Sequence, residues 1–171
     1  ANLALNIADH GFDVAVYNRT EERTREFAAS AGELSSKVIP TSSLEEFVAA
    51  IRPPRPVIIM IKAGDPVDQQ IQALKPLLEN NDIIIDAGNA NFRDTMRRFE
   101  ELKDTGLTFI GMGVSGGEEG ARFGPSIMVG GTEASWNCER RHQRHLRQIQ
   151  RRTMRGVAWR KRGRPLRQDD P

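Results

Sequence analysis

Two short apolar runs constrain the fold more than any other feature of this sequence. Residues 57–61 are hydrophobic at consecutive positions, and so are residues 83–85, which lie between Asp82 and Asp86. Such runs are typical of strands buried on both faces, as in a parallel sheet covered by helices. Each run is followed by a polar loop and then by apolar residues at helical spacing. The pattern predicts an α/β fold with a doubly wound parallel sheet.

The same alternation predicts elements along the rest of the chain. Helices are expected at residues 3–10, before Gly11, and 21–31, where acids suit the helix dipole. Ser42 and Ser43 have capping-box spacing before a third helix, and Pro66 suits the first turn of a fourth. A further helix is expected from about residue 92 to residue 103, with strands at residues 13–17 and 107–110.

A glycine-rich stretch follows the last of these strands. Residues 111–126 combine glycines with two acids, a serine and an arginine. Glycine permits close approach of the backbone to a ligand, and the specific polar groups distinguish this stretch from a Ser/Gly linker. We therefore expect a binding loop on a rigid scaffold.

Polar residues follow several predicted strands, at the edge where parallel sheets bind ligands. An acid at the end of the second strand of a nucleotide-binding domain binds the ribose of NAD, whereas arginine binds the 2′-phosphate of NADP. Asn18 followed by Arg19 and Thr20 therefore predicts NADP; a solvated surface arginine is the alternative. The expected first strand and its Gly-x-Gly-x-x-Gly fingerprint are absent from the sequence before the first helix.

Composition divides the chain into two parts. Residues 137–171 carry twelve Lys and Arg against three acids, whereas residues 1–136 carry thirteen against twenty. We expect a partial NADP-binding domain over residues 1–136 and a basic tail over residues 137–171. No apolar run approaches the ~18 residues that span a bilayer, so no membrane partner is expected. Cys138 is the single cysteine, which excludes an internal disulfide and suits the cytoplasm.

The chain resembles the 6-phosphogluconate dehydrogenase family from residue 1 to about residue 136. The resemblance is carried by Asn18-Arg19-Thr20, by residues 62–64 and 82–89, and most specifically by residues 114–122 with 124–126. It implies a Rossmann-like domain of an NADP-dependent, cytoplasmic oxidoreductase of the pentose phosphate pathway. That family decarboxylates 6-phosphogluconate oxidatively to ribulose 5-phosphate and is homodimeric, with most of the interface in an all-helical domain absent here.

The resemblance also implies roles for individual residues. Those implied for the cofactor are Asn18, Arg19 and Thr20 at the 2′-phosphate, with Ile61, Lys62, Ala63 and Asn89 bordering the remainder. Those implied for the sugar acid are Asn89, Ser115, Gly116 and Gly117. Glu118, Glu119 and Arg122 either shape the loop or contact ligand. The family's lysine base and glutamate acid belong to a motif absent here, and Lys161 does not match it, so no catalytic residue is assigned.

A frameshift offers an explanation for the tail. Back-translating residues 167–171 and regrouping from the second base permits Val-Lys-Met-Ile, the core of the missing lysine motif, and family-like segments recur in order from residue 144 to residue 160. We interpret residues 137–171 as an out-of-frame translation, largely irregular or locally helical, with its junction at Trp136. The DNA sequence around the Trp136 codon tests this hypothesis.

Two other functions remain open at this point. A related β-hydroxyacid dehydrogenase with another substrate would share the fold and a similar glycine loop. A nucleic-acid-binding protein would use the basic tail, because clustered arginines release counterions from phosphate backbones.

Overall fold

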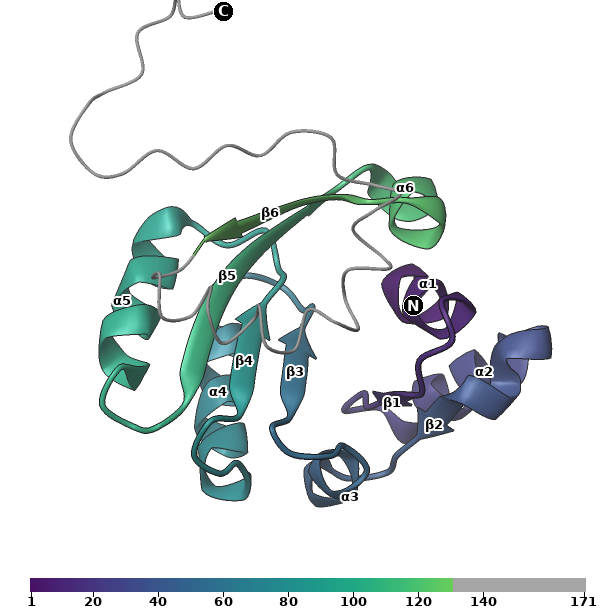
Figure 1. The fold of residues 1–171 in the computed structure, drawn as a ribbon, viewed down its shortest axis with the longest axis horizontal. Helices are drawn as coiled ribbons and strands as arrows, with labels where there is room; N and C mark the ends of the chain where they lie inside the picture. Colours follow the sequence, from purple (N-terminus) through teal and green to yellow (C-terminus); the bar gives the residue numbers. More distant parts are fainter. Residues whose placement is uncertain (131–171) are drawn as a thin grey trace, which may run out of the picture.

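A computed structural model describes residues 1–130. The expectations for residues 137–171, including Cys138 and Lys161, lie outside this range. The helices are α1 (Asn2–Asp9), α2 (Glu21–Ser30), α3 (Leu44–Ala49), α4 (Asp65–Leu74), α5 (Phe92–Leu102) and α6 (Gly117–Phe123), with 3₁₀ turns η1 (Gly32–Lys37) and η2 (Lys75–Leu77) (Figure 1). The strands are β1 (Val14–Val16), β2 (Val38–Pro40), β3 (Pro56–Ile59), β4 (Ile83–Asp86), β5 (Thr108–Ser115) and β6 (Ser126–Gly130).

The strands form two separate sheets. β1 and β2 pair in parallel, and the second sheet has the order β3-β4-β5-β6. β3, β4 and β5 are parallel, with Ile58 opposite Ile85 and Ile85 opposite Ile110. β6 pairs with β5 in the antiparallel direction. The predicted α/β fold with a doubly wound parallel sheet is confirmed. The sequence did not predict β6, which follows α6 and adds one antiparallel strand at the edge of this sheet.

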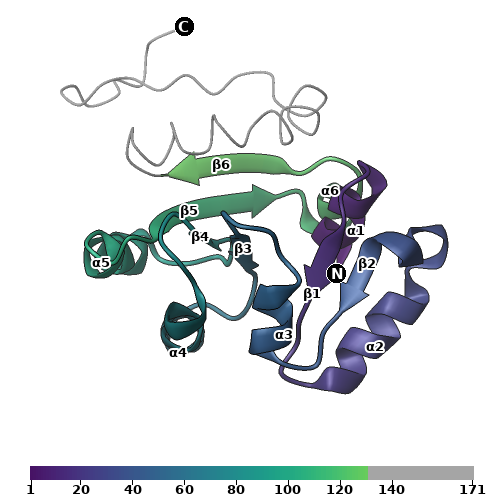
Figure 2. The same cartoon turned by 60° about the horizontal axis from the view of Figure 1, so that its bottom comes forward.

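Each sheet has its own core. The larger core is formed by β3, β4 and β5 with α3, α4 and α5, and the smaller one by α1, α2 and β2. Figure 2 shows α4 and α5 together on one side of the four-stranded sheet, away from α1 and α2. On α4, Val67, Ile71 and Leu74 are all buried, at the spacing that places them on one helix face.

Local sequence signals explain where these helices begin and end. Gly11, with φ +90°, follows α1, and Gly32, with φ +58°, follows α2. Ser43 accepts the backbone N–H of Glu46 at 3.1 Å, while the Glu46 carboxylate accepts from the N–H of Ser42 at 2.7 Å. The predicted capping box is thus confirmed, with its reciprocal bond one residue earlier than in the usual arrangement. The Ser42 N–H and the Ser42 hydroxyl, which both donate to the Glu46 carboxylate, hold the pKa of Glu46 below its ordinary value.

Two local predictions are wrong. Strand β2 was not predicted, because its two β-branched residues, Val38 and Ile39, end at once in Pro40 and form no detectable pattern. The stretch at residues 111–126 is not one loop: β5 continues to Ser115, and α6 fills most of the remainder. Met112 and Val114 alternate with glycine, and this period of two extends the strand.

Among residues 1–130, no helix is long and apolar enough to cross a bilayer.

Candidate functional site

The turn after β1 presents the first group of predicted site residues. The Thr20 N–H donates to Oδ1 of Asn18 at 2.9 Å, which closes a side-chain turn directly before α2. Asn18, Arg19 and Thr20 are all exposed. Within residues 1–130, Arg19 forms no hydrogen bond or ion pair, so its guanidinium is available to an anion. This is the chemistry expected of a phosphate-binding arginine.

The loops after β3 and β4 contact each other through Gly88. A Cβ at Gly88 would lie 3.1 Å from the carbonyl oxygen of Ile61 and 3.3 Å from Oδ1 of Asp86. The Ala87 N–H also donates to the Ile59 carbonyl at 2.8 Å. Close backbone approach therefore brings Ile61 and Asn89 to the same edge of the sheet, as predicted for two residues bordering one ligand.

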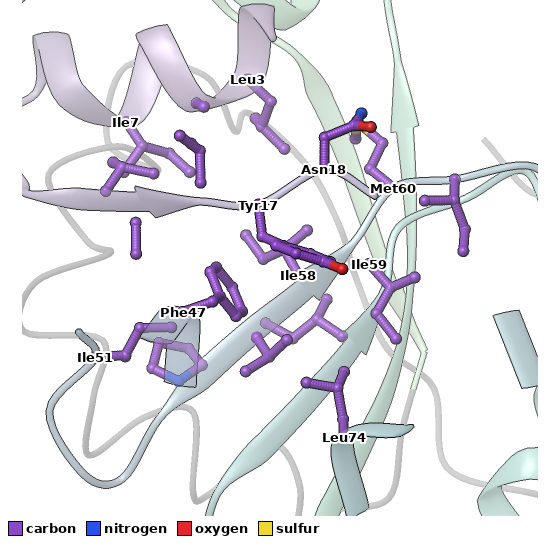
Figure 3. Close-up of a pocket in the computed structure, with 18 of the residues that line it drawn as sticks. Leu3, Ile7, Tyr17, Asn18, Phe47, Ile51, Ile58, Ile59, Met60 and Leu74 are labelled. Carbon is purple, nitrogen blue, oxygen red and sulfur yellow. The ribbon is translucent and has the colours of Figure 1, made fainter. Parts of the chain in front are cut away.

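The ends of β1 and β3 meet at a shared apolar cavity. Asn18, Met60 and Ile61 all line it, and Figure 3 shows the side chain of Asn18 beside that of Met60. Met60 and Ile61 lie beyond the end of β3 and are 44% and 41% exposed, so the predicted strand is shorter than expected. Lys62 and Asn89 are exposed next to this edge.

Arg98 on α5 connects the loops beneath this edge. Its side chain is 1% exposed and donates to Asp68 of α4 at 2.7 Å, to Oδ2 of Asp86 at 3.1 Å and to the Gly64 carbonyl at 3.0 Å. The Gly88 N–H in turn donates to Oδ1 of Asp86 at 3.2 Å. A chain of hydrogen bonds therefore runs from α5 to the residue preceding Asn89.

The Asp86 carboxyl shows how strongly this region is desolvated. Burial raises the pKa of Asp86, and the Gly88 N–H and the Arg98 guanidinium offset only part of that effect. Neither Asp86 nor Arg98 was predicted as a site residue. The available signal was an acid at the end of an otherwise apolar strand, because a buried carboxylate requires a cationic or hydrogen-bonding partner.

The predicted substrate loop is anchored to α1. Nδ2 of Asn2 donates to the Glu118 carbonyl at 3.0 Å, and Nδ2 of Asn6 donates to the Arg122 carbonyl at 2.7 Å. The Arg122 side chain approaches Asp9 at 3.3 Å. Arg122 therefore contributes to the placement of α6 on α1, whereas Ser115, Gly116 and Gly117 remain exposed. Asn6, which is 2% exposed, is a further anchoring residue, to which the sequence analysis assigned no role.

Gly116 is required by the turn between β5 and α6. Its φ is +118°, and a Cβ there would lie 3.0 Å from the Cα of Gly120. We expect Gly116→Ala to lower the free energy of unfolding by about 1–3 kcal/mol, through backbone strain and this backbone contact. Urea unfolding followed by circular dichroism measures the effect.

Gly117→Ala is the matched control for that substitution. Gly117 has φ +63° but nothing within 4 Å of an added Cβ, so the expected cost is about 1 kcal/mol from conformation alone. Equal losses in the two variants would contradict the role assigned to the close approach of Gly116 and Gly120.

Comparisons with known proteins show which family the chain resembles. A family model described as the NAD binding domain of 6-phosphogluconate dehydrogenase matches residues 1–151. The decarboxylating 6-phosphogluconate dehydrogenase 1 of Saccharomyces cerevisiae is 53% identical over 135 residues, which is 79% of this chain and 27% of the yeast protein. The Synechococcus elongatus enzyme is 53% identical over 137 residues, 80% of this chain and 29% of that relative. The chain thus spans less than a third of the length of these relatives.

Solved structures show the same fold. Plasmodium falciparum 6-phosphogluconate dehydrogenase, described in apo form and in complexes with its cofactor NADP+ and its substrate 6-phosphogluconate, superimposes with a TM-score of 0.78 at 38% identity. That match covers 90% of this chain and 32% of the solved chain. Mycobacterium tuberculosis 3-hydroxyisobutyrate dehydrogenase has a TM-score of 0.68 at 22% identity, covering 86% of this chain and 47% of the other, and shares the fold.

Proposed function

The chain belongs to the 6-phosphogluconate dehydrogenase family, matching its NAD-binding domain, and on this basis we propose that it binds NADP and 6-phosphogluconate. The observation that carries the proposal is the exposed turn formed by Asn18, Arg19 and Thr20 after β1. The whole enzyme would oxidise and decarboxylate 6-phosphogluconate to ribulose 5-phosphate. Residues 1–136 would supply its cofactor-binding side and part of its substrate-binding side.

Arg19 selects NADP in this proposal. Its guanidinium would bind the 2′-phosphate, with the Asn18 side chain and the Thr20 hydroxyl as neighbouring hydrogen-bonding groups. An NAD-selective site has an acid at this position to bind the ribose hydroxyls. The acid nearest in sequence, Glu21, forms an ion pair with Arg25 at 2.7 Å, one helical turn along α2.

The remaining contacts would lie along the edge of the larger sheet. Ile61, Lys62 and Ala63 would border the cofactor, and Asn89 would lie between cofactor and substrate. The sugar acid would bind at Ser115, Gly116 and Gly117, whose exposed backbone lies at the end of β5. The structure supports this assignment through the small residues that such close backbone approach requires: Gly88 beneath Asn89, and the two glycines before α6.

For residues 1–136 we propose ligand binding and assign no proton transfer. NADP, when bound, accepts a hydride from the substrate, but the family's lysine base and glutamate acid have no counterpart in residues 1–136. General base catalysis alone typically contributes ~10²–10⁴-fold to the rate. The residues present would orient the two ligands without moving a proton.

Replacing Arg19 by alanine tests the cofactor assignment. We expect Arg19→Ala to weaken NADP binding by about 10–100-fold, the value of one or two charge-assisted hydrogen bonds, and to leave NAD binding unchanged. Isothermal titration with each nucleotide measures both affinities.

Arg25→Ala is the matched control, because Arg25 is an exposed arginine on the same helix with Glu21 as its partner. It should leave the ratio of NADP to NAD affinity unaltered. A wild-type chain that binds the two nucleotides equally would contradict the assignment of Arg19.

The domain boundary and the cellular location are also proposals. We place the end of the family-like domain at Trp136; alignments of 135 and 137 residues to the relatives support this boundary, although the family model extends to residue 151. The single cysteine of the sequence supports a reducing cytoplasm.

The two alternative functions are less well supported. Identities of 53% favour the sugar-acid enzymes over other β-hydroxyacid dehydrogenases, and the basic segment needed for nucleic acid lies outside the described residues.

A further inference from the structure

Two buried arginine–aspartate pairs lie at opposite ends of strand β4. Asp82 immediately precedes the strand and pairs with Arg55 at 2.9 Å, whereas Asp86 ends it and pairs with Arg98 at 3.1 Å. A buried ion pair costs desolvation free energy, so it is weak evidence of a gain in stability. The two pairs differ in what else each arginine contacts, and this difference separates their roles.

Arg98 joins two loops at the carboxyl end of β4. Its guanidinium donates to both carboxylate oxygens of Asp68 on α4, at 2.7 and 3.1 Å, to Oδ2 of Asp86 at 3.1 Å and to the Gly64 carbonyl at 3.0 Å. We call these four residues the Arg98 cluster. Gly64 belongs to the loop after β3, and Asp86 leads into the loop after β4. One buried cation therefore holds both loops.

The residues proposed to border the cofactor directly adjoin this cluster. Ala63 immediately precedes Gly64 in the chain. On the other loop, the Gly88 N–H donates to the Asp86 carboxylate at 3.2 Å, and Asn89 follows. Each loop is thus tied to the Arg98 cluster within one or two residues of a proposed ligand contact.

The exposed side chains on these loops are not held by the protein itself. Lys62 and Asn89 are both exposed, and within residues 1–130 neither side chain forms a hydrogen bond or an ion pair. Their placement therefore depends on the backbone of the two loops. The loops meet at Gly88, where a Cβ would lie 3.1 Å from the Ile61 carbonyl oxygen. A shift of either loop would consequently displace the other.

The strand order places these loops beside the proposed sugar-acid site. β4 lies between β3 and β5, and β5 ends at Ser115. Hydride transfer requires contact between the nicotinamide ring and the sugar acid, so the nicotinamide half of NADP belongs at the loops after β3 and β4. Arg19, the residue proposed for the 2′-phosphate, follows β1 in the other sheet. The two halves of the cofactor would be bound by different parts of the chain.

We propose that Arg98 is a positioning residue for the nicotinamide half of the cofactor, acting through the loops after β3 and β4. This inference rests on the proposed function and extends it to a buried residue beneath the site. Arginine suits the role because its planar fork has five donors in fixed geometry, whereas lysine has a single ammonium. Without it, the Gly64 carbonyl and the Asp86 carboxylate lose their common partner, and the two loops are free to separate.

Titration with the whole cofactor and with one half of it tests the proposal on the 171-residue chain. The probes are NADP and adenosine 2′,5′-bisphosphate, which keeps the 2′-phosphate but lacks the nicotinamide half. We expect the wild type to bind NADP more tightly than the bisphosphate. Arg98→Met should weaken NADP binding about tenfold and change bisphosphate binding less than about twofold. A proportional loss for both probes, no loss for NADP, or equal wild-type affinity for the two probes would overturn the proposal.

Arg55→Met is the matched control, because it removes the other buried cation from the opposite end of β4. Arg55 is 12% exposed, and its partners Asp82 and Glu79 lie at the amino edge of the sheet. This variant also leaves a buried carboxylate without its cation and destabilises the fold. We nevertheless expect it to leave the ratio of NADP to bisphosphate affinity unchanged. An equal change of this ratio in the two variants would show an effect of destabilisation alone and overturn the proposal.

Hydrogen exchange without nucleotide tests the same role independently. Two backbone hydrogen bonds at opposite ends of β4 serve as reporters: the Ile83 N–H donates to the Arg55 carbonyl, and the Ala87 N–H donates to the Ile59 carbonyl, each at 2.8 Å. We expect Arg98→Met to accelerate exchange about tenfold more at Ala87 than at Ile83, and Arg55→Met to do the reverse. Equal acceleration at both ends in Arg98→Met would overturn the proposal.

Arg98→Lys keeps the buried charge and provides a second variant that preserves the fold. A single ammonium cannot reach the Gly64 carbonyl and both aspartates together, so we expect NADP affinity between those of the wild type and Arg98→Met. Wild-type affinity in Arg98→Lys would show that charge alone is required and would overturn the positioning role. If the wild type binds neither probe but the exchange pattern is as expected, the proposed function fails and the role of Arg98 in holding the two loops stands.

Discussion

Arg98→Met is expected to lower the free energy of unfolding by about 3–5 kcal/mol, because it leaves buried carboxylate without its cation. The Arg98 side chain is 1% exposed and its partner Asp86 is equally buried. Methionine fills much of the arginine's volume, so the loss comes mainly from charge and hydrogen bonding and less from a cavity. Urea unfolding at pH 7, followed by circular dichroism, measures the difference.

Arg97→Met is the matched control. Arg97 is adjacent on α5 and also binds Asp68, at 2.9 Å, but its side chain is 46% exposed. Water screens such a pair, so we expect an unfolding transition close to that of the wild type. If the two substitutions destabilised the chain equally, burial would not be the cause.

The decrease in the free energy of unfolding caused by Arg98→Met should become smaller as the pH falls from 8 towards 5. Burial already raises the pKa of Asp86, and removing the guanidinium raises it further. A carboxyl whose folded pKa lies above its unfolded value penalises folding at high pH, and the penalty disappears when the group protonates. A loss that stayed constant over this range would exclude charge on Asp86 as its origin.

The Arg98 cluster also shows what sequence patterns cannot provide. The strands at residues 57–61 and 82–86 were predictable because an apolar run needs only its neighbours to identify it. The contact of Arg98 with Asp68 and Asp86 depends on how α4, α5 and β4 pack, which no local pattern specifies. A motif placed Asn89 at the site, but the hydrogen bonds that position its loop come from residues 12 and 30 positions apart.

Strand pairing was predictable only in part, for a similar reason. Continuous apolar strands indicate a parallel sheet, yet β2 is too short to produce a pattern. β6 has only three apolar residues between Ser126 and Gly130, so it was not recognised as a strand after the glycine-rich stretch. β1 and β3 line the same apolar cavity and belong to different sheets. The absence of the glycine fingerprint was visible in the sequence, but the division into two sheets required the three-dimensional structure.

Asp82→Asn is the second substitution with a large expected effect, about 3 kcal/mol of unfolding free energy. The Asp82 side chain is fully buried immediately before β4. It accepts from the backbone N–H of Arg55 at 2.6 Å, from the Arg55 guanidinium at 2.9 Å and from the Glu79 N–H at 3.0 Å. Asparagine has the same shape but would direct an N–H₂ donor at one of these donors, and it leaves Arg55 without its buried anion.

The destabilisation caused by Asp82→Asn should depend on pH differently from that caused by Arg98→Met. Burial raises the pKa of Asp82, but the hydrogen bonds from the Arg55 and Glu79 amides and from the Arg55 guanidinium outweigh it, so the pKa lies below its ordinary value. A carboxylate with a depressed folded pKa stabilises the fold above its unfolded pKa of about 3.9 and loses that contribution as the pH falls further. The difference between wild type and Asp82→Asn should hold from pH 8 to pH 5 and decline only below about pH 4.

Glu79→Gln separates this buried anion from its exposed neighbour. The Glu79 carboxylate also pairs with Arg55, at 3.1 Å, but it is 69% exposed, and we expect little change in unfolding. Unfolding curves at pH 8, 5 and 3.5 for the three chains would decide the assignment. A difference between Asp82→Asn and wild type that already declines between pH 8 and pH 5 would mean that Asp82 titrates like Asp86, and that its three donors do not hold it ionised.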